Sequence, residues 1–229
     1  MITFEVITVR RDVQATAKGH AEEFRQRMQQ QGTLVVNLLS SPGSGKTSLL
    51  AATADCFLDR FRCAVLVGDI ATDRDAQRLV AHVPVVQLTT GGACHLEYPL
   101  IEQGWRALGE PEVDFLFLEN IGNLVCPASH DLGEHLRVLL LSTTEGDDKP
   151  AKYPKAFRTS HALVVSKVDL LPYVPFCIER AILDARSVQP DLAVFPTSTH
   201  PASGLEEWCE YLLEQRRQLL EGEPCRPNR

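Results

Sequence analysis

A short run of glycine and serine residues, SSPGSGKTS at positions 40–48, has the order of a phosphate-binding loop. Its glycines let successive N–H groups face phosphate oxygens, and the start of the following helix adds a partial positive charge. Lys46 would reach the β- and γ-phosphates, and the Thr47 hydroxyl would bind Mg²⁺. Ser40 takes the first position of the GxxxxGK[ST] frame, where glycine is not chemically required. The predicted nucleotide contacts in this loop are Gly43, Ser44, Gly45, Lys46, Thr47 and Ser48.

Two acidic residues stand near the ends of later strand-like runs. Asp69 ends CAVLVGD, and Glu119 lies in VDFLFLEN. Carboxylates at such positions bind Mg²⁺ or its waters, or orient the attacking water, in phosphoryl-transfer sites. Strand-end acids are common in α/β domains, but both together with the loop favour a nucleotide hydrolase. We therefore expect Lys46, Asp69 and Glu119 to be catalytic, and Thr47, Asp69 and Glu119 to hold Mg²⁺.

The run VVSKVDLLP, residues 164–172, predicts which base is bound. A strand ending in [NT]KxD presents its aspartate to guanine N1 and N2, while the lysine stem packs over the base. Lys167 and Asp169 take these positions, which favours GTP over ATP. Ser166 replaces the asparagine, so we expect a loosened loop or a weaker contact at guanine N7. Ser198, after the last strand-like run, stands where a base-contacting loop is expected.

Two cysteines and a histidine could bind a metal ion. Cys94 and His95 are adjacent in TTGGACHLEYPL, and Cys126 lies seven residues after Glu119. Two thiolates and an imidazole suit Zn²⁺ or Ni²⁺. The spacing alone leaves open whether these are ligands or buried thiols. The closeness to Glu119 would let a metal respond to the γ-phosphate. The adjacent pair is too cramped to complete a tetrahedral site, which favours a site shared across a twofold dimer.

The pattern of apolar runs predicts the fold that must position these residues. Seven runs read as strands, several of them continuously apolar, as in strands covered on both faces. Helical segments alternate with them, which predicts an α/β fold with a mainly parallel sheet. The predicted strands are 33–40, 63–69, 83–88, 113–120, 136–143, 161–167 and 192–198. The predicted helices are 16–32, 45–60, 73–82, 96–109, 174–187 and 204–220. Residues 143–160 read as a long polar connection of the kind that is functional or disordered.

Composition limits the class of protein. The chain of 229 residues carries a net charge of −7 and has a pI near 5.5, which argues against a general nucleic-acid binder. No apolar run approaches the ~20 residues of a membrane span, and the first residues lack the order of a signal peptide. We therefore expect a cytoplasmic protein with no membrane contact and with reduced thiols. Cys56, Cys63, Cys177 and Cys209 read as small buried residues, and Cys225 as an exposed thiol.

These motifs together resemble the HypB family, the nickel-insertion GTPases of hydrogenase maturation. The matching stretches are SSPGSGKT, GDIATDRDA, TGGACHL, FLENIGNLVCPASHDLGE, STTEGDDKPAKYP and SKVDLLP. The resemblance implies a SIMIBI-type GTPase of the three-layer phosphate-loop class that forms a homodimer with GTP. It implies Mg²⁺ and GTP/GDP as cofactors, and Ni²⁺ or Zn²⁺ bound by Cys94, His95 and Cys126. It also implies two partners, a zinc metallochaperone and the hydrogenase large subunit precursor, and makes Lys149 a candidate nucleotide contact across the dimer.

The chain departs from the family pattern at three places. Residues 1–32 contain no cysteine and only His20, so the N-terminal CxxCGC and histidine-rich nickel segments of many members are missing. Pro99 stands where many members have a further histidine, and Ser166 replaces asparagine. His130 could replace a lost ligand, but we expect an exposed loop histidine there. The expected organisation is a helical extension at 1–32, a GTPase domain with the metal site at 33–221 and a disordered tail at 222–229.

Other functions remain open on the sequence alone. A diverged nucleotide-dependent scaffold of maturation would bind GTP without transferring nickel, which the missing cysteines and Pro99 would fit. A urease-type nickel GTPase would have a Cys-Pro-His run, which the CPAS sequence lacks. An ATP-dependent kinase is disfavoured by Asp169 and by the lack of a recognisable acceptor-binding lid. The leading interpretation is a slow regulatory GTPase and nickel metallochaperone.

Overall fold

A single sheet runs through the protein. The structure, a computed structural model, describes residues 9–70 and 74–222, with side chains from residue 19 onward. The strand order is β3-β2-β4-β1-β5-β6-β7-β8, and β1 to β7 are all parallel, as predicted. The short β8, which was not predicted, pairs antiparallel with β7. The strands are β1 Leu34–Ser40, β2 Cys63–Asp69, β3 Val85–Thr89, β4 Phe115–Glu119, β5 Leu136–Ser142, β6 Ala162–Ser166, β7 Ala193–Thr199 and β8 Ala202–Ser203.

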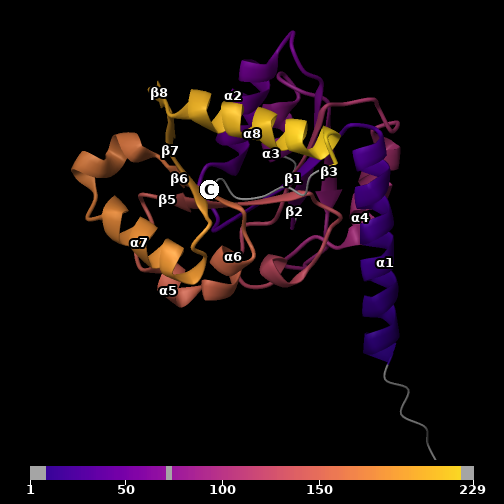
Figure 1. The fold of residues 1–229 in the computed structure, drawn as a ribbon, viewed down its shortest axis with the longest axis horizontal. Helices are drawn as coiled ribbons and strands as arrows, with labels where there is room; N and C mark the ends of the chain where they lie inside the picture. The colour runs from indigo at the N-terminus through magenta and orange to yellow at the C-terminus, as the bar shows by residue number, and fades with distance from the viewer. Residues whose placement is uncertain (1–8, 71–73, 223–229) are drawn as a thin grey trace, which may run out of the picture.

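Helices cover both faces of this sheet and give three layers (Figure 1). One face packs against α2, α3 and α8; the other packs against α1 and α4 at one end and α6 and α7 at the other. The α-helices are α1 Val9–Gln30, α2 Lys46–Phe57, α3 Arg74–Leu79, α4 Tyr98–Ala107, α5 Lys149–Lys152, α6 Pro154–Arg158, α7 Ile178–Val188 and α8 Leu205–Leu220. Two 3₁₀ turns are η1 Pro127–Ser129 and η2 Val168–Tyr173.

The central strand β1 illustrates why a continuous apolar run forms such a core. Successive side chains of a strand point to opposite faces. Leu34, Val36 and Leu38 pack with α2 and α8, whereas Val35 packs with α1 and α4, and Leu39 with α6 and α7. All five are fully buried, so both faces of the strand must be apolar. The sheet is therefore buried on both sides, as the sequence predicted.

The polar segment 143–160 differs from its predicted form. It contains α5 and α6, and Pro150, Ala156 and Phe157 are buried. Both short helices have proline in the first turn, where its missing N–H costs nothing. The buried apolar residues within a polar run explain why composition alone indicated an irregular connection.

The termini bear on the predicted organisation. Helix α1 packs on α4 and β1, and part of it extends past the body of the protein (Figure 1). Gly32 follows the helix with φ 71°, as expected for a glycine that ends a helix. The tail after residue 222, with Cys225, lies outside the described residues. In the described part of the chain, no helix has the length and apolar character needed to span a membrane.

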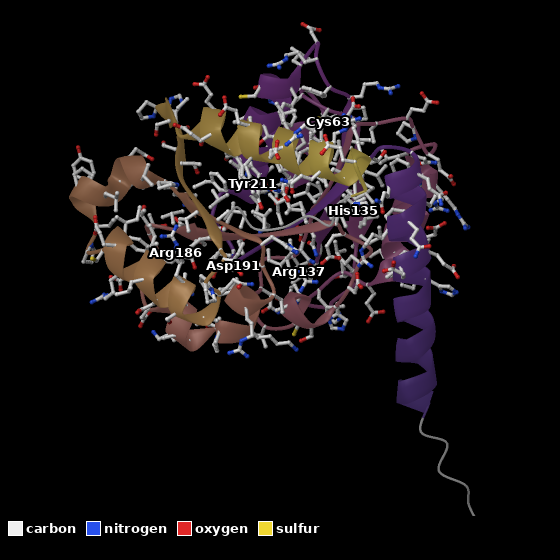
Figure 2. All side chains as sticks on the ribbon, viewed as in Figure 1. Cys63, His135, Arg137, Arg186, Asp191 and Tyr211 are labelled. Atoms are coloured by element: carbon white, nitrogen blue, oxygen red, sulfur yellow. The ribbon has the colours of Figure 1, made fainter. Side chains whose placement is uncertain are left out.

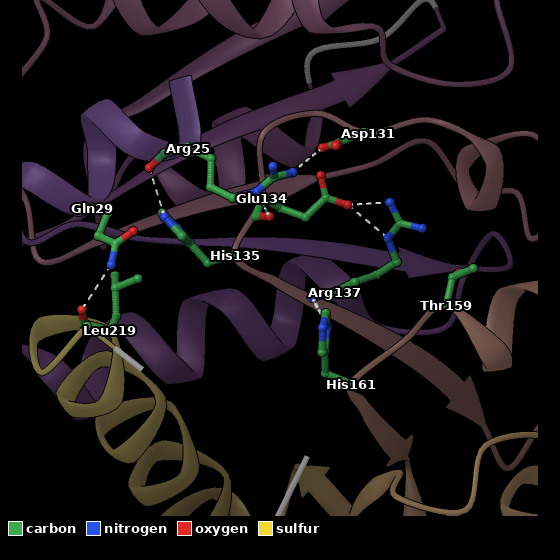
Figure 3. Close-up of a pocket in the computed structure, with 10 residues that line it drawn as sticks. Arg25, Gln29, Asp131, Glu134, His135, Arg137, Thr159, His161 and Leu219 are labelled. Atoms are coloured by element: carbon green, nitrogen blue, oxygen red, sulfur yellow. Dashed lines mark hydrogen bonds and ion pairs between the residues drawn. The ribbon is translucent and has the colours of Figure 1, made fainter. Parts of the chain in front are cut away.

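A cavity of about 610 Å³ lies at the amino ends of β1, β5 and β6 (Figure 3). Arg25 of α1 contacts Asp131, and Arg137 forms an ion pair with the buried Glu134. His135, beside α1, accepts a hydrogen bond from the Val35 N–H and contacts the Arg25 carbonyl oxygen (Figures 2 and 3). The two arginines of this cavity are thus paired, and the network fastens α1 to the sheet.

Candidate functional site

The phosphate-binding loop joins β1 to α2 at the carboxyl edge of the sheet. Gly43 and Gly45 adopt φ values of 74° and 96°, a region that favours glycine, and α2 begins at Lys46. The Lys46 ammonium is buried and donates a 2.8 Å hydrogen bond to the Ser40 hydroxyl. Burial lowers the pKa of Lys46, although the Glu119 carboxylate opposes that shift. Ser40 therefore gives the lysine a polar partner within the loop.

Thr47 and Glu119 meet in this loop. The Thr47 hydroxyl donates a 2.8 Å hydrogen bond to Glu119 Oε1, and the glutamate is 3% exposed. Burial raises the pKa of Glu119 to about 7, and the Lys46 charge limits the rise. The second oxygen, Oε2, is buried and has no hydrogen-bond partner among the described residues. An orphaned carboxylate oxygen beside a threonine hydroxyl fits a Mg²⁺ ion with its waters.

Asp69 lies near these groups because of strand order. It ends β2, which pairs with β4, and Val67 is in register with Glu119. The carboxyl ends of the two strands therefore bring both acids to the same edge of the sheet. Asp69 is half-buried, and it contributes to the electrostatic environment of Lys46 and Glu119. The predicted catalytic group of Lys46, Asp69 and Glu119 is thus assembled in one place.

The predicted base-binding residues lie against the phosphate loop. Ser166 donates a 2.6 Å hydrogen bond to the Ser44 carbonyl oxygen, and Lys167 Nζ donates one of 2.7 Å to Gly43. The loosened connection expected from Ser166 is therefore not seen, because its hydroxyl ties the two loops together. Ser198, at the end of β7, donates a 2.7 Å hydrogen bond to Asp169 Oδ1. The carboxylate is thus oriented by a residue from the neighbouring strand.

Lys149 reaches the phosphate loop of its own chain. Its Nζ lies 3.4 Å from the Ser41 hydroxyl and 3.4 Å from Glu145 Oε2. A cavity of about 270 Å³ beside it is lined by the loop, by the segment after β4, and by Lys149 and Tyr153. The lysine is thus beside the nucleotide loop, and a contact across a dimer stays a prediction.

The three predicted metal ligands come together. Cys94 and Cys126 place their sulfurs 2.9 Å apart, and His95 Nδ1 lies 3.8 Å from the Cys94 sulfur. Cys94, His95 and Cys126 offer donor atoms that all lie within 4.8 Å of one another. Among the side chains that the structure describes, residues 19–70 and 74–222, this is the one such group of three. The hydrogen bond between the thiols, with some burial, raises the pKa of Cys94. Two thiols and an imidazole at this spacing suit a borderline-soft ion.

The segment between β4 and Cys126 touches both sites. Gly122 packs so closely on Pro42 of the phosphate loop that an added Cβ would lie 2.8 Å from proline atoms. Asn123 donates a 3.2 Å hydrogen bond to the Cys94 carbonyl oxygen. The sequence carries no specific signal for Asn123, and it marks Gly122 only as part of a motif. These contacts link the phosphate loop to the metal-binding loop.

Three other side chains differ from expectation. His130 is half-buried, and its ring stacks on His95 with centroids 3.9 Å apart, so it is not an exposed loop histidine. The nearby 3₁₀ turn η1 folds it back toward Cys126. Cys56 and Cys177 are exposed, whereas Cys63 and Cys209 are buried as predicted. Cys56 lies on α2 within hydrogen-bond reach of the buried Cys209, and Cys177 directly precedes α7.

The parallel sheet, the phosphate loop and the order of the site elements define a nucleotide-binding protein of the phosphate-loop class with a SIMIBI-type GTPase fold. The signal recognition particle receptor FtsY of Elizabethkingia anophelis in complex with GDP is similar in fold, with a TM-score of 0.51 at 16% identity. It covers 83% of this chain, and the chain covers 71% of it. At that identity the likeness concerns the fold alone.

Closer similarities define the family. Residues 34–196 match the model of the CobW/HypB/UreG nucleotide-binding domain. The chain is 42% identical to the hydrogenase maturation factor HypB of Azotobacter vinelandii over 212 residues, 92% of this chain and 70% of that protein. It is 44% identical to the hydrogenase/urease maturation factor HypB of Helicobacter hepaticus, over 86% of this chain and 83% of that protein. The crystal structure of HypB from Helicobacter pylori in complex with nickel aligns with a TM-score of 0.84 at 39% identity. The alignment covers 89% of this chain and 96% of that one. The chain belongs to the HypB family of hydrogenase maturation factors.

Proposed function

We propose that this chain is a GTP-hydrolysing metallochaperone that binds Ni²⁺ or Zn²⁺ and assists nickel insertion into [NiFe]-hydrogenase. One observation carries the proposal: Cys94, His95 and Cys126 converge at the end of a segment that begins at Glu119 in the nucleotide site. The nickel complex of the Helicobacter pylori relative supports the metal assignment.

The nucleotide part of the proposal assigns a role to each group. Backbone N–H groups from Gly43 to Ser48 and the Lys46 ammonium would bind the phosphates. Thr47, Asp69 and Glu119 would hold Mg²⁺, which neutralises charge on the phosphate oxygens when bound. Asp69 would orient the attacking water. The proposed hydrolysis is slow and regulatory, as the resemblance to the family implies.

Base selection is assigned to the loop after β6. Asp169 would accept hydrogen bonds from guanine N1 and N2, and the Lys167 stem would cover the base. Ser198 would hold the Asp169 carboxylate in the orientation that the base requires, since it already donates to Oδ1. GTP and GDP are therefore the proposed ligands.

Metal and nucleotide binding should influence each other. Gly122 contacts the phosphate loop and Asn123 contacts the Cys94 loop, so one segment carries both connections. If the γ-phosphate and the metal favour the same arrangement of residues 119–126, the two affinities are coupled reciprocally. Hydrolysis would then change metal affinity and favour transfer of the nickel.

The remaining parts follow the family. We propose a homodimer with GTP, a zinc metallochaperone and the hydrogenase large subunit precursor as partners, and a cytoplasmic location. Urease is a second candidate recipient of the nickel, because the Helicobacter hepaticus relative is a hydrogenase/urease maturation factor. Maturation assays with each apoenzyme would distinguish the two recipients.

A metal titration in two nucleotide states tests this function. Ni²⁺ affinity is measured by competition with a chelator, with a non-hydrolysable GTP analogue and with GDP, on protein without a histidine tag. The two affinities should differ, and Cys94→Ala should abolish tight binding, whereas Cys56→Ala, at an exposed cysteine outside the site, should not. Equal affinities in both states would refute coupling. A silent Cys94→Ala would favour the scaffold alternative.

A further inference from the structure

The metal-binding group is incomplete within the three residues described so far. Cys94, His95 and Cys126 supply two sulfurs and one nitrogen, and structural and storage sites for such ions usually have four donors. His95 Nε2 lies 3.4 Å from Glu97 Oε1, so the ring faces the sulfurs with Nδ1. The fourth donor must come from this chain, from a second copy or from solvent.

His130 is the side chain best placed to supply it. Its ring stacks on His95 with an interplanar angle of 21° and a centroid distance of 3.9 Å. Its Nδ1 lies 2.9 Å from the carbonyl oxygen of Cys126, which is itself one of the three proposed metal ligands. A carbonyl oxygen can only accept, so Nδ1 carries the proton and the neutral ring keeps a lone pair on Nε2. Metal-binding histidines typically donate their second N–H to such a carbonyl group.

The backbone that carries His130 is held in place. Arg137 donates a 2.8 Å hydrogen bond to the His130 carbonyl oxygen, and Lys155 donates one of 2.7 Å to the Ser129 hydroxyl. Arg137 is itself paired with the buried Glu134. The residue is thus presented from a fixed turn, and binding through Nε2 requires the ring to leave its stack on His95.

We propose that His130 is a fourth ligand of the Cys94–His95–Cys126 site, binding the ion through Nε2. The site then has two thiolates and two imidazoles from one chain for a divalent borderline-soft cation such as Ni²⁺ or Zn²⁺. His130 lies outside the group of donors within 4.8 Å because its ring is stacked on His95. This proposal rests on the metal site of the proposed function and adds a residue to it.

The test compares three variants with the unmodified chain. His130→Phe keeps an aromatic ring for stacking and removes both nitrogens, and His130→Ala removes the ring. His82→Ala removes a histidine that precedes β3, at the amino ends of the strands and away from the metal site at their carboxyl ends. Ni²⁺ and Zn²⁺ affinities are measured on reduced, monomeric, untagged protein, and X-ray absorption counts the imidazoles on the bound ion. Light scattering gives the oligomeric state, and thermal unfolding shows that each variant is folded.

The expected result is two imidazoles on the ion in the unmodified chain and one in His130→Phe, with about a tenfold or greater loss of affinity in both His130 variants. His82→Ala should match the unmodified chain. Unchanged affinity and imidazole count in His130→Phe would overturn the proposal. Weak binding by His130→Ala alone would also overturn it, because the ring would then contribute only by stacking on His95. Cys94→Ala distinguishes failure of this proposal from failure of the proposed function. If Cys94→Ala binds the ion normally, the assignment of the metal site to Cys94, His95 and Cys126 is itself wrong.

Discussion

The hydroxyl of Ser166 donates a 2.6 Å hydrogen bond to the carbonyl oxygen of Ser44, joining residues 122 positions apart. The base loop is thereby fixed to the phosphate loop by a side chain that replaces the usual asparagine. Together with the Lys167 contact to Gly43, this bond gives the two halves of the nucleotide site one connected frame.

Replacing Ser166 by alanine should weaken nucleotide binding. The change removes one buried hydrogen bond, worth about 1 kcal/mol, so the affinity for GDP should fall about fivefold. Displacement of a fluorescent GDP analogue measures this effect. Ser187→Ala, which removes an exposed hydroxyl on α7, is the matched control. If the two variants bind equally well, the bond is not important for the site.

Replacing Asp169 by asparagine should change the preferred base. The carboxylate accepts two guanine N–H groups, whereas an amide can donate to the extra carbonyl group of xanthine. GDP affinity should fall about tenfold to a hundredfold, and xanthosine diphosphate affinity should rise. Calorimetric titration with both nucleotides checks this switch. Ser198→Ala should give a smaller loss without any gain for xanthosine diphosphate, because it only frees the carboxylate. Unaltered base preference in Asp169→Asn would contradict the assignment.

Glu119→Gln should make the unfolding free energy of the nucleotide-free protein fall less between neutral and high pH than it does in the unmodified chain. Burial raises the pKa of Glu119 to about 7, above its ordinary 4.5. Such a group contributes stability that is present below pH 4.5 and is lost as pH rises through 7. The glutamine cannot ionise, so the difference in unfolding free energy should grow by up to about 3 kcal/mol between about pH 5 and 9. Urea unfolding across this range measures it, and a difference independent of pH would contradict the burial argument.

His135→Asn should remove part of the acid sensitivity of the fold. Burial lowers the pKa of His135 to about 4 from its ordinary 6.5. The neutral ring therefore contributes stability that is full above pH 6.5 and is lost as pH falls toward 4, by up to about 3 kcal/mol. Asparagine can still accept the Val35 N–H in place of Nδ1. Unfolding between about pH 7 and 4 tests this, with His82→Asn outside the cavity as the control. An equal loss of unfolding free energy on acidification in both variants would be evidence against it.

The sequence predicted most of the strands because their apolar runs are short and alternate with longer helical segments. A fully buried strand such as β1 needs apolar side chains on both faces, and a short run of that kind is seldom produced by a helix or a loop. The two-residue β8 carries no such pattern, since both of its residues are exposed, and it was missed. Segment 143–160 was misread because its buried proline, alanine and phenylalanine are scattered among charged residues.

The sequence alone determined the chemistry that is local. Lys46 and Thr47 are set by a loop and a helix start, and Lys167 and Asp169 by one strand end, so their roles could be read from neighbouring letters. The tertiary structure decided the relationships between distant segments. The bond from Ser166 to Ser44, the approach of Gly122 to Pro42 and the stacking of His130 on His95 each join loops that are far apart in the chain. Such contacts depend on which carboxyl ends of the sheet are neighbours, and strand order is fixed by packing rather than by local sequence.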